Sequence, residues 1–183
     1  MADRDTYAIE IEGVARELPL FEVAPGVRIA ILNILGDTEL VQAAAAALAD
    51  RLRDVGADIL VTAETKSIPL VHELSTRLAL PYIVLRKEFR PYMGDALRVE
   101  TLSITTGKPQ TLYLDEKDRG LVRNKRVVLV DDVISTGSTL EAMRQAVAEA
   151  GGTAVAEAAV FTEGDRAKWQ DIIALGHLPV FDT

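Results

Sequence analysis

The stretch 127–143, VVLVDDVISTGSTLEAM, constrains the fold more than any other part of the sequence. Its four leading apolar residues run into Asp131 and Asp132, and a hydroxyl-rich loop around Gly137 follows. A continuous apolar run is typical of a strand that a parallel sheet buries on both faces. Leu140 and the apolar residues after it recur at helical spacing. The stretch therefore predicts a strand, a loop and a helix in succession.

The rest of the chain repeats this alternation. Asp37 or Thr38 can cap one helix, and Ser67 can cap a second. Strands are predicted at 27–34, 58–64, 81–87, 125–132, 154–161 and 177–182, with hairpins within 1–26 and 101–115. Strands that alternate with helices indicate an α/β fold with a mainly parallel sheet. The predicted class is a Rossmann-like, mainly parallel twisted sheet flanked by helices, in a single domain over 1–183.

Charge and composition exclude several classes of function. The net charge is −8 and basic residues are scattered, which argues against nucleic acid as a partner. The chain has no cysteine, so disulfides and thiolate chemistry are excluded and a cytoplasmic location is expected. The charged N-terminal segment does not resemble a signal peptide, and no apolar run reaches membrane-spanning length. A small-molecule ligand is expected.

The loop that follows the two acids is suited to binding a phosphate. Ligands of open α/β sheets bind at the carboxyl ends of the strands, where Asp131 and Asp132 are predicted to lie. Backbone N–H groups and hydroxyls over 135–139 can hold an anion at the start of a helix. The acids can accept hydrogen bonds from two sugar hydroxyls, which indicates a sugar phosphate. A simpler alternative is that Asp131 caps the turn and Asp132 faces solvent.

All thirteen positions from Val127 to Thr139 resemble the 5-phosphoribosyl 1-pyrophosphate (PRPP) signature of type I phosphoribosyltransferases. The order of elements over roughly residues 18–160 is similar to the adenine branch of that family. The resemblance implies a small hood built from 1–26 and 163–183, a lid loop and hairpin at 88–115, and a homodimer. It also implies transfer of the phosphoribosyl group from PRPP to a nucleobase, as in purine salvage.

The resemblance assigns the site residue by residue. It places the ribose hydroxyls on Asp131 and Asp132, which with Lys66, Arg86 and Lys87 form the catalytic set. Residues expected to bind the 5-phosphate are Ser135, Thr136, Gly137, Ser138 and Thr139. Residues expected to bind pyrophosphate are Glu64, Thr65, Lys66, Arg86, Lys87 and Arg90. Residues expected to bind the base are Val27, Arg28, Ile29, Thr105 and Val133. Mg²⁺ is expected to be held by PRPP oxygens and waters, without direct protein ligands.

The sequence departs from the adenine pattern where the base would bind. The lid tetrapeptide that carries an acid and an aromatic residue in that branch is Ile104-Thr105-Thr106-Gly107 here, and the hood sequence after Val27 is also different. Lys66 and Ser67 stand where the branch has arginine and glycine. The predicted function is that of a purine-type, adenine-like phosphoribosyltransferase, and these departures leave its base unassigned. A PRPP-binding regulator or non-catalytic relative is the alternative.

Overall fold

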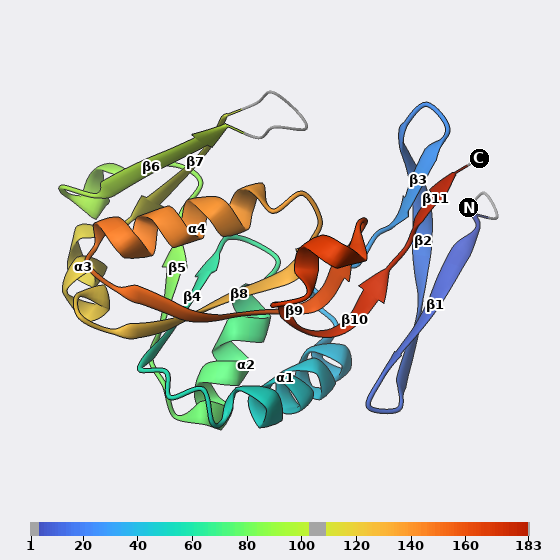
Figure 1. Cartoon of the computed structure of the whole chain (residues 1–183), viewed down its shortest axis with the longest axis horizontal. Coiled ribbons are helices and arrows are strands. Elements are labelled where there is room, and N and C mark those ends of the chain that lie inside the picture. Colours follow the sequence, from blue (N-terminus) through green and yellow to red (C-terminus); the bar gives the residue numbers. More distant parts are fainter. Residues whose placement is uncertain (1–3, 103–108, 183) are drawn as a thin grey trace.

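The computed structural model describes residues 4–102 and 109–182, and its centre is a five-stranded sheet (Figure 1). The strand order is β10-β9-β8-β4-β5, and every neighbouring pair is parallel. The strands of this sheet are β4 (Ile59–Ala63), β5 (Tyr82–Leu85), β8 (Arg126–Ile134), β9 (Thr153–Glu163) and β10 (Ile173–Leu178). The predicted α/β class with a mainly parallel sheet is confirmed.

Helices cover both faces of this sheet. α1 (Thr38–Leu52) and α2 (Ile68–Leu78) lie on one face, and α4 (Ser138–Glu149) lies on the other (Figure 1). β4 is buried along its whole length because its side chains alternate between the two layers. Leu60 packs with the α1 and α2 core, whereas Val61 packs with the α4 core. Within the described parts of the chain, no helix is long and apolar enough to cross a membrane.

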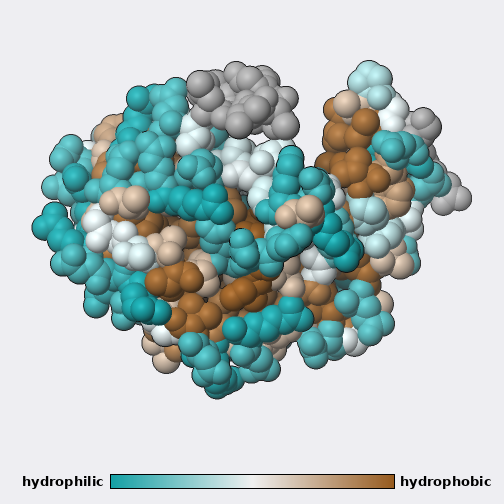
Figure 2. Space-filling view, viewed as in Figure 1, coloured by the Kyte–Doolittle hydropathy of each residue, from teal (hydrophilic) through white to brown (hydrophobic). Residues whose placement is uncertain are grey.

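A second, four-stranded sheet forms the hood at one side of the molecule (Figure 1). Its strands are β1 (Thr6–Ile11), β2 (Val14–Ala24), β3 (Val27–Ala30) and β11 (Val180–Asp182). The predicted strand 27–34 therefore ends at Ala30. The predicted strand 177–182 divides in two, because β10 belongs to the parallel sheet and β11 pairs with β3. Figure 2 shows apolar side chains gathered on the hood, where Phe21 and Val23 are exposed.

An antiparallel hairpin is inserted before β8. It consists of β6 (Leu97–Leu102) and β7 (Pro109–Leu114), and it begins earlier than the predicted hairpin at 101–115. Val99 and Leu112 are buried in the α4 core, which attaches the hairpin to that layer. The lid position Thr105 lies outside the described residues. Three short elements were not predicted from the sequence: η1 (Pro91–Met93), α3 (Glu116–Val122) and η2 (Arg166–Trp169).

Candidate active site

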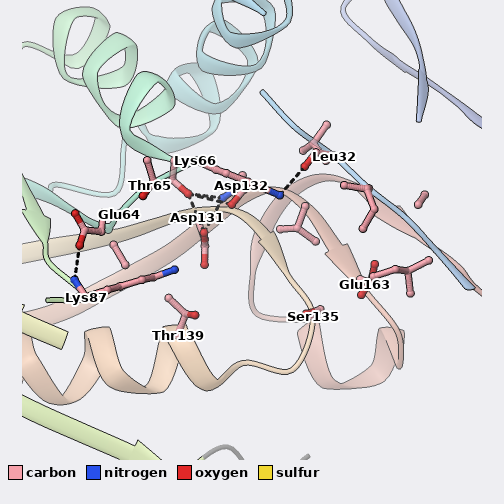
Figure 3. A pocket seen from close by; sticks show the side chains of 16 residues that line it. Leu32, Glu64, Thr65, Lys66, Lys87, Asp131, Asp132, Ser135, Thr139 and Glu163 are labelled. Atoms are coloured by element: carbon pink, nitrogen blue, oxygen red, sulfur yellow. Dashed lines mark hydrogen bonds between the residues drawn. The ribbon is translucent and has the colours of Figure 1, made fainter. Parts of the chain in front are cut away.

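A cleft of about 480 Å³ opens at the carboxyl ends of β4 and β8 and extends to the segment that leaves the hood (Figure 3). The residues that line it are Ile29, Ala30, Ile31, Leu32, Ala63, Glu64, Thr65, Lys66, Ser67, Lys87, Asp131, Asp132, Val133, Ser135, Thr139 and Glu163. Ten of the side chains predicted from the sequence are among these sixteen. The fold thus brings together residues more than one hundred positions apart in the chain.

The loop between β8 and α4 adjoins this cleft as a small recess of about 40 Å³. Ser135, Thr136, Gly137 and Thr139 line it, and α4 begins at Ser138. The first N–H groups of a helix have no intrahelical acceptor, so they are available to an anion in such a recess. Together the loop and the helix start provide the donors that a phosphate requires.

Gly137 is required here for two reasons. Its φ of +82° lies in the left-handed region, which favours glycine. A Cβ at this position would also lie 2.8 Å from Cη2 of Trp169. The sequence indicated only that the backbone approaches the anion closely, so the contact with Trp169 is a finding of the tertiary structure.

Gln110 of β7 connects the inserted hairpin to residues 135–139, which are called the phosphate loop because they are predicted to bind a phosphate. Its Nε2 donates to the Thr139 hydroxyl at 2.9 Å, and its Oε1 accepts from the Ser138 hydroxyl at 3.1 Å. Gln110 had no role in the sequence prediction because its partners lie about thirty positions further along the chain. These bonds give the hairpin a direct link to the residues that surround the recess.

Ser67 bonds to both acids of the opening motif. Its hydroxyl donates to Asp131 Oδ1 at 2.8 Å and to Asp132 Oδ1 at 3.1 Å, and it accepts from the Asp132 N–H at 3.0 Å. Ser67 occupies the N-cap position of α2, as predicted, but its side chain forms no cap bond. Ser67 has helical φ and ψ, and its side chain turns toward the acids instead. Asp131 accepts from the Asp132 N–H at 2.9 Å, as the capping alternative expected, but Asp132 lines the cleft and bonds to Ser67 rather than only facing solvent.

Burial, and next to it repulsion by the neighbouring Asp132 carboxylate, together raise the pKa of Asp131 to about 7. The hydrogen bond from Ser67 acts in the opposite direction and is smaller. A carboxylate kept in such a place without a nearby cation is poorly stabilised. The pair is therefore arranged to receive donors or positive charge from a ligand.

This raised pKa predicts how stability depends on pH. Between about pH 4 and pH 7, Asp131 is protonated in the folded protein and ionised in the unfolded chain. The stability of the folded protein therefore falls as the pH rises through this window. The Asp131→Asn variant has no carboxylate to ionise in the cleft, so it does not lose this stability at high pH. At pH 8 we expect the variant to be more stable than the parent by about 2–4 kcal/mol, since one pKa unit corresponds to about 1.4 kcal/mol.

Urea unfolding at pH 4 and pH 8 measures this effect. The two proteins should be nearly equal in stability at pH 4 and differ at pH 8. If the two proteins differ in stability by the same amount at pH 4 and at pH 8, folding does not shift the pKa of Asp131.

Two lysines lie on either side of the acidic pair in the cleft (Figure 3). Lys66 Nζ donates to the Leu32 carbonyl at 3.1 Å, and Lys87 extends into the cleft toward the acids (Figure 3). Glu64 binds Arg86 Nε at 2.6 Å and accepts from the Lys87 N–H at 2.6 Å. Burial alone would raise the pKa of Glu64, but the Lys87 N–H and the Arg86 guanidinium together lower it. Glu64 thus remains ionised and holds the segment that carries Lys87.

Several predicted site residues do not line the cleft. Arg86 is paired with Glu64, and Arg90 is paired with Glu88 on the surface. Val27 and Arg28 lie on β3, and Arg28 binds Asp5 at 2.7 Å. Thr136, Gly137 and Ser138 belong to the phosphate loop beside the cleft. The predicted roles of all these residues stay predictions.

Glu163 lines the cleft but was not predicted from the sequence. It is the last residue of β9, and the sequence offered one signal, an acid that ends an apolar strand. That signal was not used because the predicted strand ended at 161.

Residues 31–175 match the family model of the phosphoribosyl transferase domain. The chain therefore belongs to the phosphoribosyl transferase domain family. A hypoxanthine/guanine phosphoribosyltransferase of Methanocella paludicola is 34% identical over 115 residues, which are 63% of this chain and 56% of the relative. The chain spans little more than half the length of this relative.

Solved structures share the fold at lower identity. An adenine phosphoribosyltransferase from Thermoanaerobacter pseudethanolicus has a TM-score of 0.66 and 20% identity, with 94% of this chain and 95% of that chain covered. An adenine phosphoribosyl transferase from Trypanosoma brucei, in complex with AMP, pyrophosphate and ribose-5-phosphate, has a TM-score of 0.61 and 20% identity, with 79% and 67% covered. These likenesses establish the type I phosphoribosyltransferase fold.

Proposed function

We propose that the protein transfers the 5-phosphoribosyl group of PRPP to a purine base and releases pyrophosphate. One observation carries this proposal: the cleft joins an acidic pair, a phosphate loop and two lysines at the carboxyl edge of a parallel sheet. A sugar that bears a phosphate at one end and a pyrophosphate at the other matches that order of groups. The family assignment supports the same reading.

Each group has a task in this reaction. Residues 135–139 bind the 5-phosphate, and Asp131 and Asp132 bind the ribose hydroxyls. Lys66 and Lys87 stabilise the negative charge that develops on the leaving pyrophosphate. The reacting carbon passes through an oxocarbenium-like state, and the nearby carboxylates offset its positive charge. Ser67 orients both acids through the bonds described above.

The residues present suit a Mg²⁺ ion that arrives with the substrate. Over residues 4–102 and 109–182, no cluster of three or more histidine or acidic side chains could enclose a metal. Asp131 and Asp132 are assigned to the ribose hydroxyls, so such an ion would keep waters and substrate phosphates as its ligands. Such an ion would neutralise part of the pyrophosphate charge.

Two groups of relatives support a purine as the acceptor but differ in the base. The curated relative is named for hypoxanthine and guanine, and the solved structures are named for adenine. Hood residues Ile29 to Leu32 line the cleft at the end away from Glu64 and offer apolar side chains there. An apolar wall of this kind suits the face of a purine ring.

Pyrophosphate release from PRPP tests the proposal. Purified protein is incubated with PRPP, Mg²⁺ and one base at a time: adenine, hypoxanthine, guanine, xanthine, uracil or orotate. We expect release with at least one purine and none with the pyrimidines. Ribose 5-phosphate binding is measured in parallel by calorimetry. Binding without any turnover would instead favour a PRPP-binding regulator.

A further inference from the structure

Glu163 is a buried acid of the cleft that the steps above do not use. It is 7% exposed and ends β9. The pairing of Ile134 with Thr162 places Glu163 next to Ser135, at the same edge of the sheet. Trp169 Nε1 donates to its carbonyl oxygen at 2.9 Å, which fixes its backbone. Its carboxyl group therefore has a defined position in the cleft.

No donor within the described ranges satisfies this carboxylate. None of the hydrogen bonds or ion pairs of residues 4–102 and 109–182 involves its side-chain oxygens, and burial raises its pKa. Its oxygens are reached from the cleft and have acceptor capacity that no described protein donor uses, so a ligand donor can pair with them. Because Glu163 lines the cleft, that ligand can reach it there.

The position of Glu163 indicates which part of a ligand it would meet. In Figure 3 it lies at the opposite end of the cleft from Glu64 and Lys87, and Asp131 and Asp132 lie between. Glu163 and Leu32 lie on the same side of the acidic pair in this view. With the pyrophosphate at the Lys87 end and the ribose on the acids, the part of the nucleotide left for the Glu163 end is the base.

We propose that Glu163 accepts a hydrogen bond from an amino group of the base and so favours aminopurines over hypoxanthine. This inference rests on the proposed function, because it assumes that a purine occupies the hood end. An exocyclic amino group donates to a carboxylate, whereas a carbonyl oxygen at the same place repels it. A buried hydrogen-bonding group discriminates strongly, since the wrong ligand leaves it unpaired. Neither the relatives' names nor the sequence pattern assigns this residue.

Three nucleotides test the proposal without requiring turnover. AMP and IMP differ at position 6, and GMP differs from IMP by an amino group at position 2. Calorimetry measures the Kd of each, and of ribose 5-phosphate, for the parent protein and for Glu163→Gln. We expect AMP or GMP to bind the parent more tightly than IMP. The variant should lose about tenfold or more of that preference, the value of a hydrogen bond to a charged group.

Glu157→Gln is the matched control, since it makes the same change on the same strand. Glu157 pairs with Arg144 and does not line the cleft, so its variant should keep the parent's preference. Glu163→Ala provides a second variant, which should lose the preference as Glu163→Gln does. Ribose 5-phosphate should bind all four proteins equally well, because it has no base.

Two results would overturn the proposal while leaving the proposed function intact. One is a parent protein that binds ribose 5-phosphate but binds AMP, GMP and IMP equally. The other is a preference that persists in both Glu163 variants. A parent that binds neither ribose 5-phosphate nor any nucleotide would overturn the proposed function itself, and the role of Glu163 with it.

Discussion

Asparagine at position 131 or 132 is expected to lower kcat/KM for PRPP by about 10- to 100-fold in each variant, because a hydrogen bond to a charged group is worth about 1.5–3 kcal/mol. The acids make few bonds within the protein beyond those to Ser67 and to the Asp132 N–H. Their remaining acceptor capacity is open to ligand hydroxyls. Steady-state pyrophosphate release measures the loss.

The stability of the same variants separates a catalytic role from a structural one. Neither variant should lose stability at neutral pH, and Asp131→Asn should gain it for the electrostatic reason given above. Asp50→Asn serves as a control, since Asp50 is a surface acid paired only with Arg53 across one helical turn. Variants at 131 and 132 that unfold readily but keep full turnover would contradict the proposed role of the acids.

The second large effect is expected at the phosphate loop. Gly137→Ala should weaken ribose 5-phosphate and PRPP binding by at least about tenfold, because the new Cβ would meet Trp169 at 2.8 Å and the loop or the ring must move. Left-handed φ also costs a non-glycine residue about 1–2 kcal/mol. Calorimetry with ribose 5-phosphate measures the change in affinity.

Gly13→Ala is the matched control for this effect. Gly13 has a φ of +80° in the β1–β2 turn, and nothing lies within 4 Å of its added Cβ. It should therefore cost stability without weakening ligand binding. Equal affinities in both variants would show that the conformation of Gly137 is unimportant for the phosphate. Trp169 is the single tryptophan of the chain, so its fluorescence offers a second readout of changes at the loop.

The β8–α4 unit could be predicted from the sequence because its information is local. Apolar continuity identified the buried strand, and the spacing of Leu140 and Met143 identified the helix. The alternation of such units then gave the parallel sheet. The acids and the loop predicted to bind the 5-phosphate came from one short segment, where chemistry and secondary structure are encoded together.

The hood strands were harder to predict because their pairing is not local. β11 pairs with β3 across some 150 positions, and no sequence pattern separates it from β10, which ends two residues earlier. The division of the predicted strand 177–182 between two sheets depends on where the chain can reach an unpaired edge. Only the packed structure decides this.

The class of fold and the acidic and hydroxyl groups of the site could be predicted from the sequence, since these follow from residue type and spacing. Tertiary structure alone decided the neighbours of those groups. It directed the Ser67 side chain to both acids, paired Arg86 with Glu64, and placed Glu163 in the cleft. The physical reason is that a side chain's partners depend on which strand ends meet at the sheet edge, and distant segments of the chain supply those ends.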